Sequence, residues 1–188
     1  QIVNDFGIQN YNNRNIAQHR HLLVKYFPNL IVLKGLLSIL YLALVLGIGW
    51  WAGYTLPHFS LLLFIAFNQI LFSLVLYLRS NVSGLGRYRL DSLLSVTDRL
   101  LLILICSVLL WGNLVPGPFR IEWFVWAQTA SLSMTALIAM SIVARRLPRF
   151  RLRINPVFLR YLLRESAPYA LSIFLMSAYY RLDGLMIE

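Results

Sequence analysis

Residues 30–52 read LIVLKGLLSILYLALVLGIGWWA, and the one charged side chain in this stretch is Lys34. A helix rises about 1.5 Å per residue, so about 20 apolar residues cross the ~30 Å hydrocarbon core of a bilayer. A helix also satisfies its own backbone hydrogen bonds, which lipid cannot do. The stretch therefore predicts a membrane-spanning helix, and it sets the fold class for the rest of the chain.

Apolar stretches of similar length recur along the chain. We expect spans at about 30–52, 57–78, 93–112 and 121–143, followed by a truncated span over 167–188. The composition agrees, since 59% of the residues are hydrophobic and 13% are charged, whereas soluble domains hold about 45–50% apolar and about 25% charged residues. The sequence thus predicts an all-α, polytopic membrane protein. Because the chain starts at Gln1 and stops inside an apolar stretch, we expect a fragment of a longer protein.

The basic residues between the apolar stretches predict the orientation. Arg120 alone falls in the two connections 53–56 and 113–120, and all the others fall at the opposite ends of the spans. These others are Arg14, Arg20, Lys25, Arg79, Arg87, Arg89, Arg145, Arg146, Arg149, Arg151, Arg153, Arg160 and Arg164. Positive charge is retained in the cytoplasm, so residues 1–29 and 144–166 are expected there. The formal net charge of +10 follows from this topology, and no nucleic-acid partner is expected.

The tryptophans agree with this orientation. Every tryptophan lies near a span end that the charges assign to the outer face: Trp50, Trp51, Trp111, Trp123 and Trp126. Tryptophan prefers the headgroup zone because its ring is apolar while its N–H needs a partner.

Residues 144–166 predict a basic cytoplasmic connector. After Asn155-Pro156, leucines and a phenylalanine share one helical face, with Arg160 and Arg164 opposite. This pattern predicts an amphipathic helix that can lie on an anionic leaflet, although a plain connector that obeys the positive-inside rule would look the same. Ser166 is expected to cap the next helix, with Pro168 in its first turn.

Four charges lie inside the expected spans: Asp98, Arg99, Arg181 and Asp183. Each costs about 2.5–3.5 kcal/mol at the bilayer centre on insertion scales. Lys34 is expected to cost less, because its long side chain can reach the nearby headgroups. Asp98 and Arg99 should lie about 8–9 Å, and Arg181 about 21 Å, from the cytoplasmic side. The two sets are therefore not expected to pair directly.

Two interpretations of these charges remain open. They can pair inside a bundle and fix helix orientation, or they can line a polar cavity. In a cavity, an arginine can bind phosphate or pyrophosphate through forked hydrogen bonds. An aspartate can bind a cation or carry a proton.

Other chemical signals are weak. Cys106 is the one cysteine, and the three histidines show no spacing typical of metal ligands. The glycines of SGLGRYR (residues 83–89) lack the context of a phosphate loop. Because no nucleophile and base stand in a recognisable pattern, the sequence predicts no enzyme, no metal and no cofactor.

Three stretches resemble the Wzx-type polysaccharide flippases, the polysaccharide biosynthesis branch of the multidrug/oligosaccharidyl-lipid/polysaccharide exporter superfamily. They are DFGIQNYNNRNIAQHR (5–20), RSNVSGLGRYRLDSLLSVTDRLLLILI (79–105) and YYRLDGLMI (179–187). In these flippases an acidic-aromatic-glycine turn precedes an arginine and an Ile-Ala pair, and an Arg-x-Asp sits in the seventh helix. The order of the three stretches matches across nearly the whole chain.

The resemblance implies a fold of two six-helix lobes with about 12–14 helices, of which this chain holds helices three to six, the interlobe connector and most of helix seven. It implies a transporter that flips an undecaprenyl-pyrophosphate-linked oligosaccharide across the bacterial inner membrane by alternating access, with H⁺ or Na⁺ as a coupling ion. The partners that it implies are the lipid-linked oligosaccharide, the bilayer, a polysaccharide polymerase and a chain-length regulator.

The resemblance also implies roles for the charged residues. Arg181 and Arg99 would attract pyrophosphate or close a gate, and Asp183 and Asp98 would neutralise them or take part in ion coupling. At the cytoplasmic rim, Arg14 and Arg79 would draw in the anionic headgroup.

Three other functions compete with this one. A cation-coupled multidrug antiporter of the same superfamily would have a more acidic cavity. A membrane-embedded polysaccharide polymerase or glycosyltransferase would need a large outer loop or a site rich in carboxylates, and both outer loops here are short. A structural scaffold would have no need of Arg181 in mid-membrane.

Overall fold

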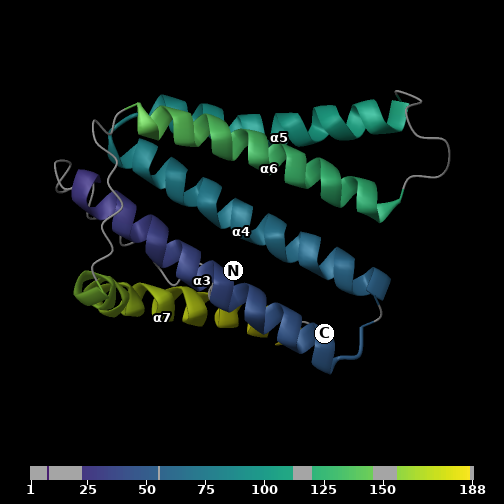
Figure 1. Ribbon diagram of the computed structural model, residues 1–188, viewed down its shortest axis with the longest axis horizontal. Helices are drawn as coiled ribbons and strands as arrows, with labels where there is room; N and C mark the ends of the chain where they lie inside the picture. The colour runs from purple at the N-terminus through teal and green to yellow at the C-terminus, as the bar shows by residue number, and fades with distance from the viewer. Residues whose placement is uncertain (1–7, 9–22, 55, 112–119, 146–155, 187–188) are drawn as a thin grey trace.

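A computed structural model describes residues 8, 23–54, 56–111, 120–145 and 156–186. Within these ranges the side chains of residues 23–26, 56–58, 156–159 and 180–186 are not described. Apart from Ile8, the described chain consists of long helices and the short turns between them (Figure 1). The helices are α3 (Leu23–Trp51), α4 (Leu56–Gly84), α5 (Tyr88–Trp111), α6 (Ile121–Ala144) and α7 (Pro156–Met186).

The helices α3 to α6 confirm the four complete spans expected from the sequence. Each contains a segment long and apolar enough to cross a membrane: Phe27–Trp51, Phe59–Gly84, Tyr88–Trp111 and Ile121–Ala144. The helices α3 and α5 begin earlier than the expected spans, and α4 ends later. At 29 residues each, α3 and α4 are about 44 Å long, which matches a bilayer with its headgroups. Helices of this length can therefore continue through the headgroup layer.

α7 differs from the expected pair of helices. The helix runs without a break from Pro156 to Met186, and Ser166 is buried within it, so the prediction that Ser166 caps a new helix is wrong. Pro168 lacks an N–H, but the loss of one hydrogen bond bends a helix more readily than it ends one. Figure 1 shows such a bend, with the first turns of α7 seen end-on and the rest running across the view.

The part of the connector that lies in α7 is amphipathic. Leu162 is fully buried in the core, while Arg160 and Arg164 are exposed, as the amphipathic pattern predicts. Its place on a cytoplasmic leaflet, and the start of a second lobe at residue 167, stay predictions.

α4 lies at the centre of the described bundle (Figure 1). It contacts α3 on one side and both α5 and α6 on the other, while α7 packs against α3. Successive helices from α3 to α6 run in opposite directions. The end of α3, the end of α5 and the start of α6 therefore share one end of the bundle, where all five tryptophans lie.

Two tight turns end their helices with a glycine. Gly53 and Gly86 have φ of 72° and 81°, the left-handed region that glycine enters without a steric cost. The Tyr54 N–H donates to the Gly49 carbonyl at 3.2 Å, and the Arg87 N–H donates to the Val82 carbonyl at 3.3 Å. Both are Schellman endings, which satisfy carbonyls that the helix leaves open.

α6 packs closely because its buried face carries small side chains at every fourth position. Ala127, Ser131, Thr135, Ala139 and Val143 are all buried. In lipid, small residues let helix backbones approach and gain van der Waals contact, since there is no hydrophobic drive between helices. This face of α6 meets α4 and α5.

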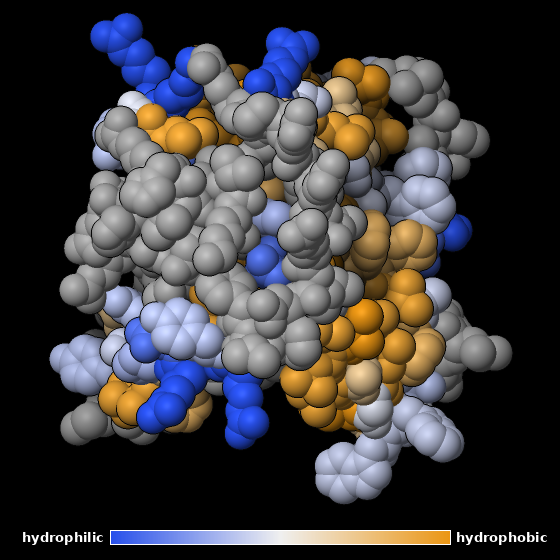
Figure 2. All heavy atoms as spheres, turned by 60° about the vertical axis from the view of Figure 1, so that its left-hand side comes forward, coloured by the Kyte–Doolittle hydropathy of each residue, from blue (hydrophilic) through white to orange (hydrophobic). Residues whose placement is uncertain are grey.

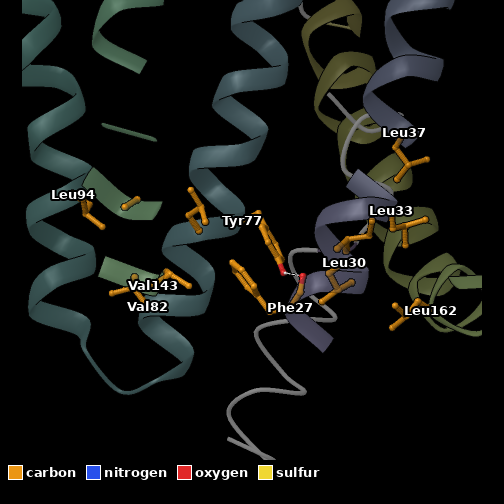
Figure 3. Packing of buried hydrophobic residues seen from close by; sticks show 12 residues of the cluster. Phe27, Leu30, Leu33, Leu37, Tyr77, Val82, Leu94, Val143 and Leu162 are labelled. Carbon is orange, nitrogen blue, oxygen red and sulfur yellow. Dashed lines mark hydrogen bonds between the residues drawn. The ribbon is translucent and has the colours of Figure 1, made fainter. Parts of the chain in front are cut away.

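The core is a cluster of buried side chains from α3 to α7 together with Ile8. Phe27, Leu30 and Leu33 of α3 meet Leu162 of α7 on one side and α4 on the other (Figure 3). The fully buried Tyr77 of α4 donates its hydroxyl to the Phe27 carbonyl at 3.2 Å. A buried phenol needs such a partner, and this bond ties α4 to α3.

The outer surface of the bundle is apolar. Ile39, Leu104 and Leu137 are 67%, 59% and 69% exposed, and Figure 2 shows a broad hydrophobic patch on one flank. Hydrophilic side chains gather at the upper and lower edges of the end that faces the viewer (Figure 2). Soluble proteins rarely expose apolar patches of this extent. The protein is therefore a multi-pass membrane protein whose flanks face lipid.

We expect Ala139→Leu to destabilise the bundle by about 1–3 kcal/mol, because Ala139 is fully buried and a larger side chain would push α6 away from its neighbours. Thermal unfolding of the full-length protein in detergent measures the effect. Ala130→Leu is the matched control, since Ala130 lies on the exposed face of the same helix. Equal melting temperatures for the two variants would contradict the packing described here.

Candidate functional site

A polar pocket lies near the middle of the spans, where α4, α5 and α6 meet. Its cavity volume is about 230 Å³. The polar side chains that line it come from all three helices: Asn68, Gln69, Asp98, Arg99, Gln128 and Ser131. Apolar side chains such as Phe72 and Leu132 form the rest of the wall. Polar groups at this depth are expensive unless they have partners, so the pocket is a candidate functional site.

α5 brings Asp98 and Arg99 to the pocket as neighbours in sequence. α5 starts at Tyr88, so the two residues lie about 15 Å from its first residue, deeper along the helix than the expected 8–9 Å. The expectation placed the helix start at residue 93, but Arg89 and Asp91 are also helical. Their charges can lie in the headgroup layer while the helix continues.

Asp98 is half-buried and Arg99 is exposed. The Ser131 hydroxyl donates to the Asp98 carbonyl at 2.8 Å and lies 3.4 Å from the carboxylate oxygen Oδ1. Arg99 makes no ion pair or hydrogen bond with the described residues. Its five N–H donors are thus open to a ligand or to a part of the chain outside the described residues.

Asn68 and Gln128 were missed by the sequence reasoning. Asn68 is 4% exposed, and its Nδ2 donates to the Val125 carbonyl at 3.1 Å. The Thr129 hydroxyl donates to Asn68 Oδ1 at 2.7 Å, so α6 holds this amide in place. Gln128 makes no hydrogen bond within the described residues. The adjacent amides Asn68 and Gln69 inside an apolar stretch were the available signal.

Lys34 does not reach the headgroups, and the prediction that it does is wrong. Its side chain is 4% exposed. Its Nζ donates to Ser73 Oγ at 2.6 Å and to the Ser73 carbonyl at 3.2 Å. The same Nζ lies 5.7 Å from the centre of the Tyr77 ring, within reach of a cation–π attraction. Lys34 therefore turns inward because α4 offers it oxygen acceptors and an aromatic face.

Arg79 lies at the end of α4 and is paired with Asp91 in the first turn of α5. Its Nε donates to Asp91 Oδ1 at 2.7 Å, and the two side chains are 23% and 26% exposed. The pair closes the turn between the helices. The expected place of Arg79 at the cytoplasmic rim and its role in drawing in a headgroup stay predictions.

The other predicted site residues cannot be placed in the same way. Arg14 lies outside the described residues. Arg181 and Asp183 lie in α7, but their side chains are not among those described. Their roles stay predictions. No group of three or more potential metal ligands occurs among the described residues.

A family model described as polysaccharide biosynthesis protein matches residues 1–188. The chain belongs to this family. The resemblance found in its three sequence stretches is therefore confirmed. Neither a curated protein nor a solved structure matches the chain. Membership of the polysaccharide biosynthesis protein family assigns a role in the synthesis or transport of polysaccharide to this membrane-embedded bundle.

We expect Ser73→Ala to destabilise the full-length protein by about 1–3 kcal/mol, because a buried ammonium loses its 2.6 Å hydrogen bond to the Ser73 hydroxyl. The double variant Lys34→Met/Ser73→Ala should lose less unfolding free energy than the two single variants lose in sum. We expect this difference to be at least about 1 kcal/mol. Thermal unfolding of the four proteins in detergent gives this coupling. Ser141→Ala is the control, because Ser141 is an exposed residue of α6, and its effect on stability should simply add to that of Lys34→Met. If the effects of Ser73→Ala and Lys34→Met also add, the hydrogen bond between the two residues is refuted.

We expect Arg79→Glu to destabilise the α4–α5 turn by about 1 kcal/mol, because it puts two carboxylates side by side at a partly exposed pair. Arg79→Glu/Asp91→Arg should restore the melting temperature. Polysaccharide export by the exchanged variant then tests the second role of Arg79. Full export would show that Arg79 only closes the turn, whereas restored stability with reduced export would support its role in headgroup attraction.

Proposed function

We propose that the protein is a transporter that flips a lipid-linked oligosaccharide from the inner to the outer leaflet by alternating access. The family assigns the polysaccharide context, and the four spans place the protein in the membrane. A substrate with a polar head and a lipid tail needs a polar path between apolar flanks. The pocket between α4, α5 and α6 supplies polar groups at mid-membrane depth.

Arg99 carries the proposal. No described residue pairs with Arg99, and a guanidinium at this depth costs several kcal/mol unless an anionic or polar partner reaches it. The planar guanidinium matches two oxygens of a phosphate at once. In this proposal Arg99 contacts the pyrophosphate that joins the lipid to the sugars. Because α7 packs against α3 and away from the pocket, Arg181 is not part of this contact, and its role in attracting pyrophosphate rests on the family resemblance.

Asp98 is the proposed point of ion coupling. Its carboxylate lies beside Ser131 Oγ and lines the same pocket as Arg99. Binding of H⁺ or Na⁺ would remove its negative charge and so change the field that Arg99 presents to the substrate. Asp183 would have the corresponding part on α7.

The same proposal places the protein in the inner membrane of a bacterium. There the lipid-linked oligosaccharide is its substrate, and a polysaccharide polymerase and a chain-length regulator act on the product. The pocket gives less support to a multidrug antiporter, which would have a more acidic cavity, because the one carboxylate that lines this pocket is accompanied by the arginine Arg99.

We expect Arg99→Ala to lower polysaccharide export by about tenfold or more, the effect of losing one charged hydrogen-bonded contact of about 1.5–3 kcal/mol. Lipid-linked repeat units should accumulate inside the cell. Arg99→Lys should keep only part of the export, because an ammonium cannot form the two parallel hydrogen bonds of a guanidinium. The measurement is surface polysaccharide and lipid-linked repeat units in cells with matched protein levels.

Arg89→Ala is the control for this experiment. Arg89 is an exposed arginine in the first turn of the same helix, about 15 Å from Arg99 along the axis. Export should be unchanged in this variant. If Arg99→Ala exports as well as Arg89→Ala does, Arg99 is not on the substrate path.

A further inference from the structure

We propose that the pocket between α4, α5 and α6 is a subsite for one neutral sugar ring of the transported glycolipid. The inference rests on the proposed function and adds to it which part of the substrate this pocket receives. Arg99 stands at the mouth of the subsite and meets the pyrophosphate, while the interior meets the sugar that the pyrophosphate carries.

The exposure of the lining residues gives the pocket an inside and a mouth. Asn68 and Ser131 are buried, and Asp98 and Gln128 are half-buried. Arg99 is the exposed polar residue of the set. The cation therefore lies at the outer edge, and the groups behind it are a carboxylate, amides and a hydroxyl.

The charge of the interior selects against a phosphate group. Behind Arg99 the one charged group that lines the pocket is the carboxylate of Asp98. A phosphate placed there would face a like charge at low dielectric, which is strongly unfavourable. The hydroxyls of a sugar instead donate hydrogen bonds to a carboxylate, and such charge-assisted bonds are strong.

The side-chain amides of the pocket suit a ligand that both donates and accepts hydrogen bonds. A primary amide has two N–H donors and two acceptor positions on its oxygen. Asn68 uses one donor on Val125 and one acceptor position on Thr129, so one of each remains. Gln128 uses none within the described residues. Adjacent hydroxyls on a pyranose ring present this mixture of donors and acceptors.

The volume and the lining of the pocket also suit a single ring. About 230 Å³ is less than most drug-sized pockets, which hold about 300–1,000 Å³. Ile65, Phe72, Leu102 and Leu132 provide apolar walls between the polar groups. A sugar ring has C–H faces as well as hydroxyl edges, so it can use both kinds of wall at once.

The test measures binding to the full-length protein in lipid nanodiscs with two probes. One probe is a polyprenyl pyrophosphate that carries a single N-acetylhexosamine, and the other is the same polyprenyl pyrophosphate without a sugar. We expect the wild-type protein to bind the first probe at least about tenfold more tightly than the second. Gln128→Met, which keeps the side-chain length but removes the amide, should lose most of this preference and bind the sugar-free probe as wild type does.

Arg99→Ala and Ala130→Leu are the matched variants. Arg99→Ala should weaken binding of both probes, because both carry the pyrophosphate, and Ala130→Leu on the exposed face of α6 should change neither. If Gln128→Met does not fold, Gln128→Ala takes its place. Equal binding of the two probes by wild type would overturn the subsite, and so would an equal loss for both in the Gln128 variant.

Translocation of the sugar-bearing probe in proteoliposomes separates this inference from the proposed function. Translocation by a wild type that does not distinguish the probes would support the flippase and remove the sugar subsite. A wild type that prefers the sugar-bearing probe but does not translocate it would support the subsite and contradict the flippase.

Discussion

The close packing of α6 against α4 is the contact on which the rest of the described structure depends. Lipid provides no hydrophobic drive to hold two apolar helices together, so contact at short range has to do so. The buried small residues from Ala127 to Val143 allow this approach. Only because the two backbones are close can Asn68 of α4 bond to the Val125 carbonyl of α6. The pocket is formed beside this contact.

α4 has a second polar connection on its opposite side. Ser73 accepts a hydrogen bond from Lys34 of α3, and Tyr77 donates one to the Phe27 carbonyl of α3. Asn68 and Gln69 line the pocket on the side of α5 and α6. A polar group in hydrocarbon favours whichever neighbour satisfies it, so these contacts set the rotation and the axial position of α4. The central helix is thus both the support of the pocket and a part of its wall.

The two polar regions differ in what they can do. Around Lys34 the described acceptors are protein groups, and the bonds join α3 to α4. In the pocket, Arg99 and Gln128 have donors that no described residue uses. A satisfied polar group in a membrane stabilises packing, whereas one that faces a pocket without a protein partner is available to a ligand. This difference is why the pocket, and not Lys34, is the basis of the proposed function.

The sequence alone determined where the chain crosses the membrane and to which family it belongs, because hydropathy and the three family stretches are local properties of the chain. It also located Asp98 and Arg99 as charges within a span. The tertiary structure decided which polar groups meet. It turned Lys34 inward, paired Arg79 with Asp91, and brought Asn68 and Gln128 beside Asp98 and Arg99. These contacts depend on the rotation and the axial position of each helix relative to its neighbours, and packing between helices sets both.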